Sequence, residues 1–297
     1  MKEVNFINST TSRRYMSSIR TGVFWHDIFK GQDWPIIGDK FMHFPEVLAE
    51  VLDYENVQLF ESKPVSDELL LKVHTPYLVE SFKQAWYYEG GSRTIGGMVE
   101  AMEKICEGKL TNALNFMVAV GHHAGRASAW GGTYASLTGP VIYNAREKYG
   151  IKKFAILDTD SHHADGTREI FFGDHDVLHV CFCSSNVIED NGTKICVDAG
   201  YHTSDENYLN LVRKEFIPRI KEFKPYVIIH LLGHDTAEGD YGSRGLSKEF
   251  FLDLVRLVNK HAKEICEGRY LITSMGGDRV DLADYIFPNV VKILSGR

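Results

Sequence analysis

Near-continuous apolar runs of strand length recur beyond residue 110, and they constrain the fold of this chain more than any other feature. Five such runs occupy residues 116–120, 154–157, 177–182, 227–232 and 271–275. Amphipathic stretches separate several of them, and residues 247–266 carry one apolar stripe at helical spacing. Apolar strands that alternate with amphipathic helices indicate a mostly parallel sheet covered by helices on both faces. We therefore predict an α/β fold.

No shift in composition marks a linker or a domain boundary. A chain of 297 residues is long enough to bury one large core. We predict a single domain over residues 21–297, preceded by a polar segment at residues 1–20. That segment carries arginines among serines and threonines and lacks the apolar core of a secretory signal or membrane anchor.

The first hundred residues contain shorter predicted elements. In order, these are a strand at 23–25, an aromatic loop through Trp34 and Pro35, a helix from Pro45, a helix at 67–72 capped by Ser66, a helix at 78–86, a flexible loop at 90–93, and a helix at 95–106 that ends at Gly108.

Composition excludes several classes of partner. The formal net charge of −7, with scattered Lys and Arg, argues against a nucleic-acid-binding surface, which needs a basic face. No window is apolar and long enough for a membrane-spanning helix.

The five cysteines are an odd number and favour a reducing cytoplasm. Cys181 and Cys183 share one face of an apolar run, and we interpret them as part of a buried strand rather than a redox pair or metal ligands.

Three carboxylates and two imidazoles directly follow the apolar run at 154–157. Alternation along an extended chain places Asp158, Asp160 and His162 on one face. Oxygen and nitrogen ligands without thiolate suit Zn²⁺ or Fe²⁺, and an incomplete protein shell is typical of catalytic rather than structural zinc. We predict a metal site here, against the alternative of a surface Asp/His turn.

Residues able to do chemistry also follow three other predicted strands. These are His122 and His123, then Asp235, then Asp278 and Arg279. Ligands bind outside the carboxyl ends of strands in open parallel sheets, so we expect all four groups to converge on one site. Asp235 is the predicted third metal ligand, with a helix N-cap as its alternative.

A carboxylate behind an imidazole fixes its tautomer and raises its basicity. Asp158 and Asp165 remain available for that role beside the His122-His123 pair once Asp160 and His162 bind metal. The alternative for an adjacent histidine pair is a solvated turn.

Three motifs together resemble those of the zinc-dependent histone deacetylase and acetylpolyamine amidohydrolase family. They are Gly121-His122-His123-Ala124, the segment Asp158-x-Asp160-x-His162-His163-x-Asp165-Gly166-Thr167, and Leu232-Gly233-His234-Asp235-Thr236-Ala237-x-Gly239-Asp240. The resemblance implies the single-domain arginase–deacetylase fold, with Asp160, His162 and Asp235 as zinc ligands. It also implies that His122 with Asp158, and His123 with Asp165, flank the attacking water. The resemblance also implies a structural K⁺ or Na⁺ near the backbone of residues 158–162. This inference is weaker, because the residues that would contribute from the next strand are Cys181-Phe182-Cys183-Ser184 in this chain.

Two departures from the family pattern concern the walls of the site. The family usually follows its last strand with glycines and a tyrosine that polarises the substrate carbonyl, whereas this chain aligns Asp278 there. An anion at that position would repel a developing oxyanion, which leaves Arg279 or Tyr285 as candidate donors. The family's Gly-Phe pair becomes Gly131-Gly132, so we expect a wider or differently shaped channel.

The leading hypothesis is a zinc-dependent amidohydrolase that cleaves the C–N amide bond of a small acylated amine or an acyl-lysine with metal-activated water. With Asp278 in place of tyrosine, we expect weak activity on acetyl-lysine peptides. The main alternative is a metal-binding family member without catalysis that senses a ligand. A binuclear arginase-like hydrolase would need bridging carboxylates, and no second histidine-rich ligand set is evident. The sequence is compatible with an oligomer.

Overall fold

A computed structural model describes residues 20–31 and 39–297 of the chain. The predicted polar segment lies outside this part except for Arg20, and so do Trp34 and Pro35. The assignment of residues 1–20 as a separate segment therefore stays a prediction.

One nine-stranded sheet runs through the domain in the order β2-β1-β3-β9-β8-β4-β5-β7-β6. All neighbouring pairs are parallel except β6 with β7. The strands are β1 (Thr21–Trp25), β2 (Val57–Glu61), β3 (Asn112–Asn115), β4 (Phe154–Asp158), β5 (Val177–Cys183), β6 (Val187–Glu189), β7 (Lys194–Asp198), β8 (Val227–Leu232) and β9 (Tyr270–Ser274). The predicted α/β fold with a mostly parallel sheet is confirmed.

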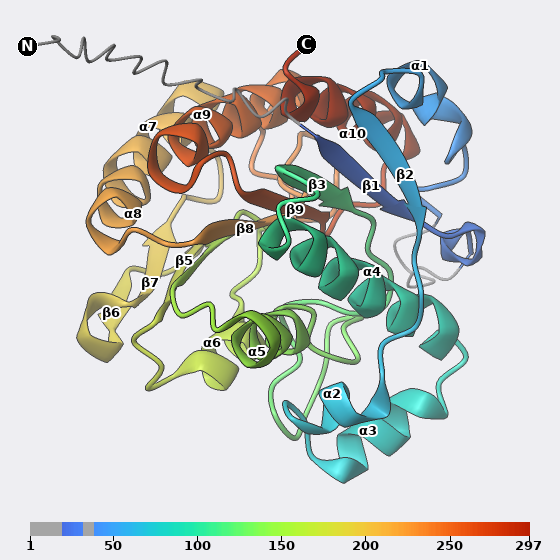
Figure 1. Ribbon diagram of the computed structural model, residues 1–297. Helices are drawn as coiled ribbons and strands as arrows, with labels where there is room; N and C mark the ends of the chain where they lie inside the picture. Colours follow the sequence, from blue (N-terminus) through green and yellow to red (C-terminus); the bar gives the residue numbers. More distant parts are fainter. Residues whose placement is uncertain (1–19, 32–38) are drawn as a thin grey trace, which may run out of the picture.

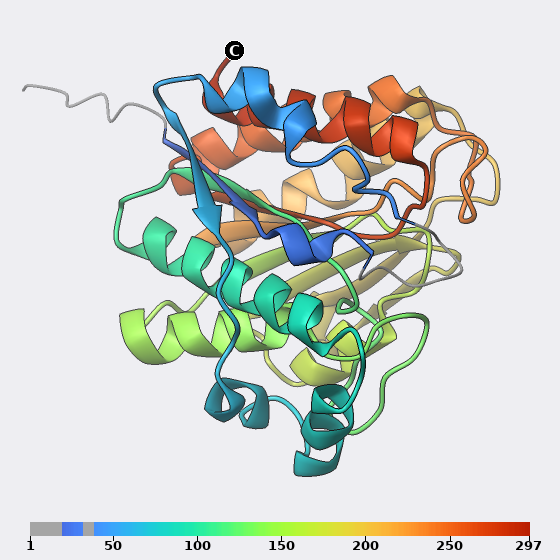
Figure 2. The same ribbon diagram turned by 90° about the vertical axis from the view of Figure 1, so that its right-hand side faces the viewer.

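Helices cover both faces of the sheet, which Figure 2 shows nearly edge-on. On one face lie α1 (Ala49–Leu52), α7 (Asp205–Glu215), α8 (Ile217–Phe223), α9 (Lys248–Cys266) and α10 (Val280–Ser295), seen along the top and left of Figure 1. On the other lie α2 (Asp67–Leu71), α3 (Pro76–Lys83), α4 (Tyr88–Cys106), α5 (Thr138–Tyr149) and α6 (Asp165–Phe171). Short 3-10 turns occur at Asp27–Phe29, Glu46–Leu48 and Asp190–Gly192.

Each face of the sheet has its own hydrophobic core, because side chains alternate along a strand. Leu157 of β4 points into the core beneath α9 and α10, whereas its neighbour Ile156 points into the core beneath α4 and α5. Burial on both faces explains why the strand sequences are continuously apolar rather than alternating.

The predicted N-cap at Ser66 is confirmed. The Ser66 hydroxyl accepts a hydrogen bond from the Leu69 amide at the start of α2, and Ser247 caps the start of α9 in the same way by accepting from the Phe250 amide. The first amide groups of a helix have no hydrogen-bond partner within the helix, and each serine provides an acceptor for one of them.

The prediction of a loop at residues 90–93 is wrong, because this segment forms part of α4. The glycines of α4 are required for close packing: a Cβ on Gly91 would lie 2.8 Å from the Phe82 ring, and a Cβ on Gly96 would lie 1.9 Å from the Lys63 carbonyl oxygen. The glycines lower helix propensity, but burial of this face outweighs that cost.

The predicted strand at residues 116–120 is also wrong, because β3 ends at Asn115. The apolar residues that follow are buried yet leave the sheet ladder. Their amide groups donate hydrogen bonds to side-chain hydroxyls instead: the Met117 amide donates to Ser274, and the Val118 amide donates to Thr94. Ala119 then takes a positive φ of 58°, which turns the chain toward the histidine pair.

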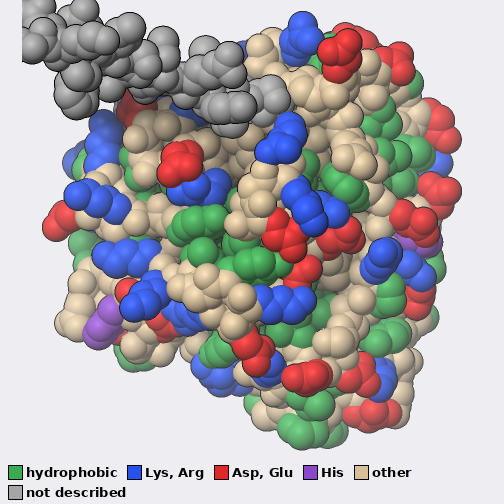
Figure 3. Space-filling model, viewed as in Figure 1, with side chains coloured by type: hydrophobic (Ala, Val, Ile, Leu, Met, Phe, Trp, Pro, Cys, Tyr) green, Lys and Arg blue, Asp and Glu red, His purple; other side chains and the backbone are tan. Residues whose placement is uncertain are grey.

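Within residues 20–31 and 39–297, no helix combines the length and apolarity needed to cross a bilayer. On the face in Figure 3, acidic and basic side chains are interspersed rather than gathered in one basic patch.

Candidate active site

The candidate site lies at the carboxyl ends of β3, β9, β8 and β4, which are neighbours in the sheet. Because these strands are parallel, the residues that follow them emerge at the same edge. This arrangement brings together the histidine pair after β3, the Asp-rich segment after β4 and Asp235 after β8, as the sequence predicts.

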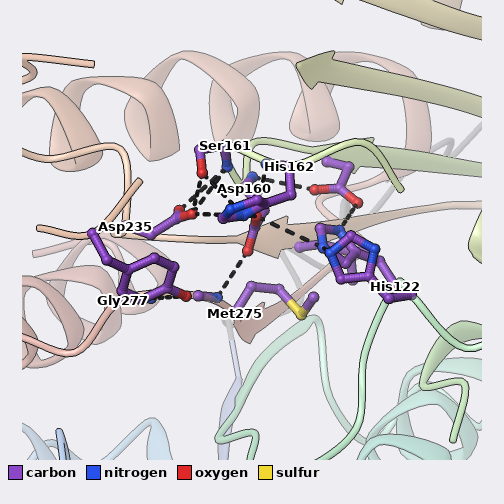
Figure 4. A network of polar contacts seen from close by, with 12 residues as sticks. His122, Asp160, Ser161, His162, Asp235, Met275 and Gly277 are labelled. Carbon is purple, nitrogen blue, oxygen red and sulfur yellow. Dashed lines mark hydrogen bonds and ion pairs between the residues drawn. The ribbon is translucent and has the colours of Figure 1, made fainter. Parts of the chain in front are cut away.

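Asp160, His162 and Asp235 form the centre of the site. One ligand atom from each lies within 4.8 Å of the others. The His162 Nδ1 atom is 2.9 Å from Asp160 Oδ1 and 3.3 Å from Asp235 Oδ2, as Figure 4 shows. Both carboxylates are buried, at 3% and 0% exposure, which demands a compensating positive charge.

Backbone and hydroxyl donors orient the two carboxylates. The Gly276 amide donates to Asp160 Oδ2 at 3.0 Å, and the Ser161 amide and hydroxyl both donate to Asp235. These hydrogen bonds fix the orientation of the two carboxylates. Gly276 has no room for a side chain, because a Cβ there would lie 2.5 Å from Asp160 Oδ2.

This donor set fits Zn²⁺. Bonds of about 2.0–2.2 Å to oxygen and nitrogen place two ligand atoms of tetrahedral zinc about 3.3–3.5 Å apart. The separations of 2.9 and 3.3 Å between His162 Nδ1 and the two carboxylates need only a small adjustment to match. Three protein ligands without thiolate are typical of catalytic zinc, and Fe²⁺ accepts the same donor types.

Two histidine–aspartate pairs stand beside this centre. His122 Nδ1 lies 2.8 Å from Asp158 Oδ2, and His123 Nδ1 lies 2.7 Å from Asp165 Oδ1. The two Nε2 atoms approach one another at 3.1 Å, so the rings share a single edge of the site. Carboxylates behind both rings fix which nitrogen faces the centre.

The surroundings push the pKa values of the two imidazoles in opposite directions. Burial alone would lower the pKa of His122, but the charges of Asp158 and Asp160 raise it to about 9. Burial, followed by the neighbouring His122, lowers the pKa of His123 to about 4. These opposite directions favour a charged His122 beside a neutral His123, an arrangement typical of acid–base pairs.

A cavity of about 230 Å³ opens onto these groups. Trp130 forms one wall: its ring centroid lies 4.1 Å from that of His123, and its indole N–H donates to Asp165 Oδ2 at 2.7 Å. Gly131 and Gly132 continue this wall, and both have positive φ. Met117 and Met275 add apolar lining.

The structure does not bring the predicted carbonyl donors to this cavity. The Arg279 guanidinium pairs with Asp281 and donates to the Glu238 carbonyl at 2.9 Å. The Tyr285 ring lies in α10 beneath the Lys248 ammonium, 4.4 Å away. Neither residue lines the cavity, and neither does Asp278.

Tyr241, which the sequence analysis overlooked, does line the cavity. It follows β8 in the same loop as Asp235, and its ring lies nearly parallel to His162 with centroids 5.9 Å apart. Its hydroxyl accepts a hydrogen bond from the Gly277 amide at 3.0 Å. A Cβ on Gly276 would lie 2.6 Å from this hydroxyl and 2.5 Å from Asp160 Oδ2, so the two oxygens lie close together beside Gly276, with no room for a methyl group between them.

Asp240 fixes the loop that carries Tyr241. Its buried carboxylate accepts hydrogen bonds from the amides of Asp278 and Arg279 and from the Tyr241 amide. The turn after β9 is therefore tied to the loop after β8. The signal available in the sequence was a tyrosine directly after the Asp235–Asp240 motif, in a loop already assigned to the site.

Comparisons with known proteins agree with this architecture. Residues 39–294 match the family model of the histone deacetylase domain. The chain is similar to a histone deacetylase-like amidohydrolase of Pseudomonas aeruginosa, with 26% identity over 81% of this chain and 71% of that protein. It is also similar to a probable deacetylase of Archaeoglobus fulgidus, with 25% identity over 93% and 86% of the two chains. The solved HDA15 HD domain shares the fold, with a TM-score of 0.81, 19% identity, and coverage of 94% and 90%.

Proposed function

Because the chain belongs to the histone deacetylase family, we propose that it is a zinc-dependent amidohydrolase acting on a small acylated amine or an acyl-lysine. Family membership supports deacylase chemistry in general. The observation that carries the finer proposal is the cluster of Asp160, His162 and Asp235 beside two histidine–aspartate pairs at one cavity.

Asp160, His162 and Asp235 would hold the metal ion. Bound Zn²⁺ supplies a Lewis acid that polarises an amide carbonyl and makes water acidic enough to attack near neutral pH. The two buried carboxylates carry opposite charge to the ion, and the hydrogen bonds from Gly276 and Ser161 keep them oriented before it binds.

His123 is the proposed general base. Its depressed pKa favours a neutral imidazole at pH 7, its ring lines the cavity with Nε2 3.1 Å from His122 Nε2, and Asp165 holds Nδ1. His122, with a raised pKa, carries positive charge beside the reacting centre and stabilises negative charge that develops there. The proton taken by His123 is then available for the leaving amine.

Tyr241 is the proposed donor to the substrate carbonyl. The Gly277 amide occupies one lone pair of the hydroxyl oxygen, so the hydroxyl proton remains free to point into the cavity. Burial raises the pKa of Tyr241 well above its usual value, which keeps that proton in place. The expectation of weak acetyl-lysine activity rested on Asp278 at this position, and Asp278 lies outside the cavity.

The test is turnover by the zinc-loaded protein of a panel containing N-acetyl amines, N-acyl amino acids, formamides and acetyl-lysine peptides. We expect release of carboxylate and amine from at least one class. His123→Ala serves as the control, because loss of the base removes turnover while the three metal ligands remain. Absence of turnover across the panel with zinc and with iron would favour a ligand-binding protein without catalysis.

A further inference from the structure

Three cysteines and a histidine form a second cluster on the far side of the metal-ligand loop. Cys181 and Cys183 lie two apart on β5 and so share one face of the sheet. The register of β5 with β7 places Cys196 opposite Cys181, and the three cysteines pack together with Ala164. His163, the residue after the metal ligand His162, reaches the same cluster.

The imidazole lies unusually close to two of the sulfurs. His163 Nδ1 is 3.3 Å from Cys196 Sγ and 3.7 Å from Cys183 Sγ. Zinc–sulfur bonds of about 2.3 Å and zinc–nitrogen bonds of about 2.0–2.1 Å place nitrogen and sulfur about 3.5–3.6 Å apart in tetrahedral zinc. The two separations lie on either side of this value, so the side chains already approximate two edges of a zinc tetrahedron.

The burial of the cluster also favours a metal. Cys183 and Cys196 are 1% and 3% exposed, whereas His163 is exposed, which gives an ion an entry path. Strand packing alone explains buried thiols, but it does not require an imidazole directed at them. The Arg168 guanidinium donates to Cys196 Sγ at 3.4 Å, as an outer hydrogen bond to a metal-bound thiolate would.

We propose that His163, Cys183 and Cys196 form a second zinc site, distinct from the candidate catalytic centre, with Cys181 as the adjoining thiol. Thiolate ligands select Zn²⁺ over K⁺ or Na⁺, which prefer oxygen. Because His163 follows His162 directly, an ion here ties β5 and β7 to the loop that carries the catalytic ligands. Such an ion would therefore brace that loop.

The experiment counts and identifies the bound metal in the full chain under reducing conditions. We expect two zinc ions per chain, of which the Cys183→Ser/Cys196→Ser variant retains one. Replacement of zinc by Co²⁺ distinguishes the two sites, because only a thiolate site gives an intense sulfur-to-cobalt charge-transfer band in the near ultraviolet. Asp235→Asn should keep this band, and the double serine variant should lose it.

Two further variants guard against misfolding. His163→Ala changes an exposed side chain and keeps both thiols, and it should weaken zinc retention and alter the cobalt band. Cys266→Ser removes a buried thiol outside the cluster and should keep both ions and the band. A single zinc ion per chain without a charge-transfer band would overturn the proposal.

Discussion

Replacement of Tyr241 by phenylalanine tests the proposed carbonyl donor most directly. The change removes one hydroxyl and keeps the ring that stacks near His162. Loss of one preorganised donor to an oxyanion typically lowers kcat by about 10²–10³, or about 3–4 kcal/mol. We expect a loss in that range with KM nearly unchanged, because the hydrogen bond strengthens only as negative charge develops on the carbonyl oxygen.

The structure limits the other consequences of this change. Tyr241 is not a metal ligand, so zinc content should stay at the wild-type level. The Gly277 amide loses its acceptor, which costs about 1 kcal/mol of unfolding free energy. The assay measures kcat and KM on the best substrate of the panel, metal content by mass spectrometry, and thermal unfolding.

Two matched variants complete this experiment. Arg279→Ala breaks a surface pair with Asp281, and Tyr285→Phe removes a hydroxyl outside the cavity, so both should leave kcat near the wild-type value. If Tyr241→Phe keeps full activity while Arg279→Ala loses it, the donor has been assigned to the wrong residue.

Four further predictions follow from the site and its supports. His123→Ala should lower kcat by about 10²–10⁴ while zinc stays bound; release of zinc would show instead that the ring is structural. Gly276→Ala should reduce zinc occupancy, because its Cβ would lie 2.5 Å from Asp160 Oδ2; a variant with full zinc content would contradict this close packing. Chelation should lower the free energy of unfolding by about 3 kcal/mol for each zinc site, relative to protein held at a hundredfold excess of zinc over the Kd of that site, and added zinc should restore it. Burial lowers the pKa of His74 from 6.5 to about 4, so the imidazole of the unfolded chain gains its proton first as the pH falls. The free energy of unfolding should therefore drop by about 2 kcal/mol between pH 7 and about pH 5. Denaturant unfolding should show a smaller drop in His74→Gln.

The sequence predicted five of the nine strands, which are buried on both faces, and it missed β2, β6 and β7. The apolar runs near residues 154–157, 177–182, 227–232 and 271–275 all correspond to strands. The run at 116–120 failed because burial alone does not distinguish a strand from a buried turn. There, hydroxyls of Thr94 and Ser274, distant in sequence, replace the strand partners.

The positions of the site residues were predictable to the extent that they follow parallel strands directly. Asp160, His162 and Asp235 meet because their strands are neighbours in the sheet. Tyr241 was not predictable in this way, because its position depends on Asp240 joining two loops through backbone amides. The pairing of His163 with Cys196 likewise depends on the β5–β7 register, which no local pattern encodes.

The placement of Tyr241 has a consequence for how relatives are classified as active or inactive. A column-by-column alignment pairs the family's tyrosine with Asp278 and would mark this chain as a pseudoenzyme. Tyr241, the proposed donor, nevertheless lines the cavity of this chain from another loop, where its hydroxyl accepts a hydrogen bond from the Gly277 amide. Loss of activity in divergent homologues should therefore be inferred from where hydroxyl groups lie in space, after every loop at the rim has been considered.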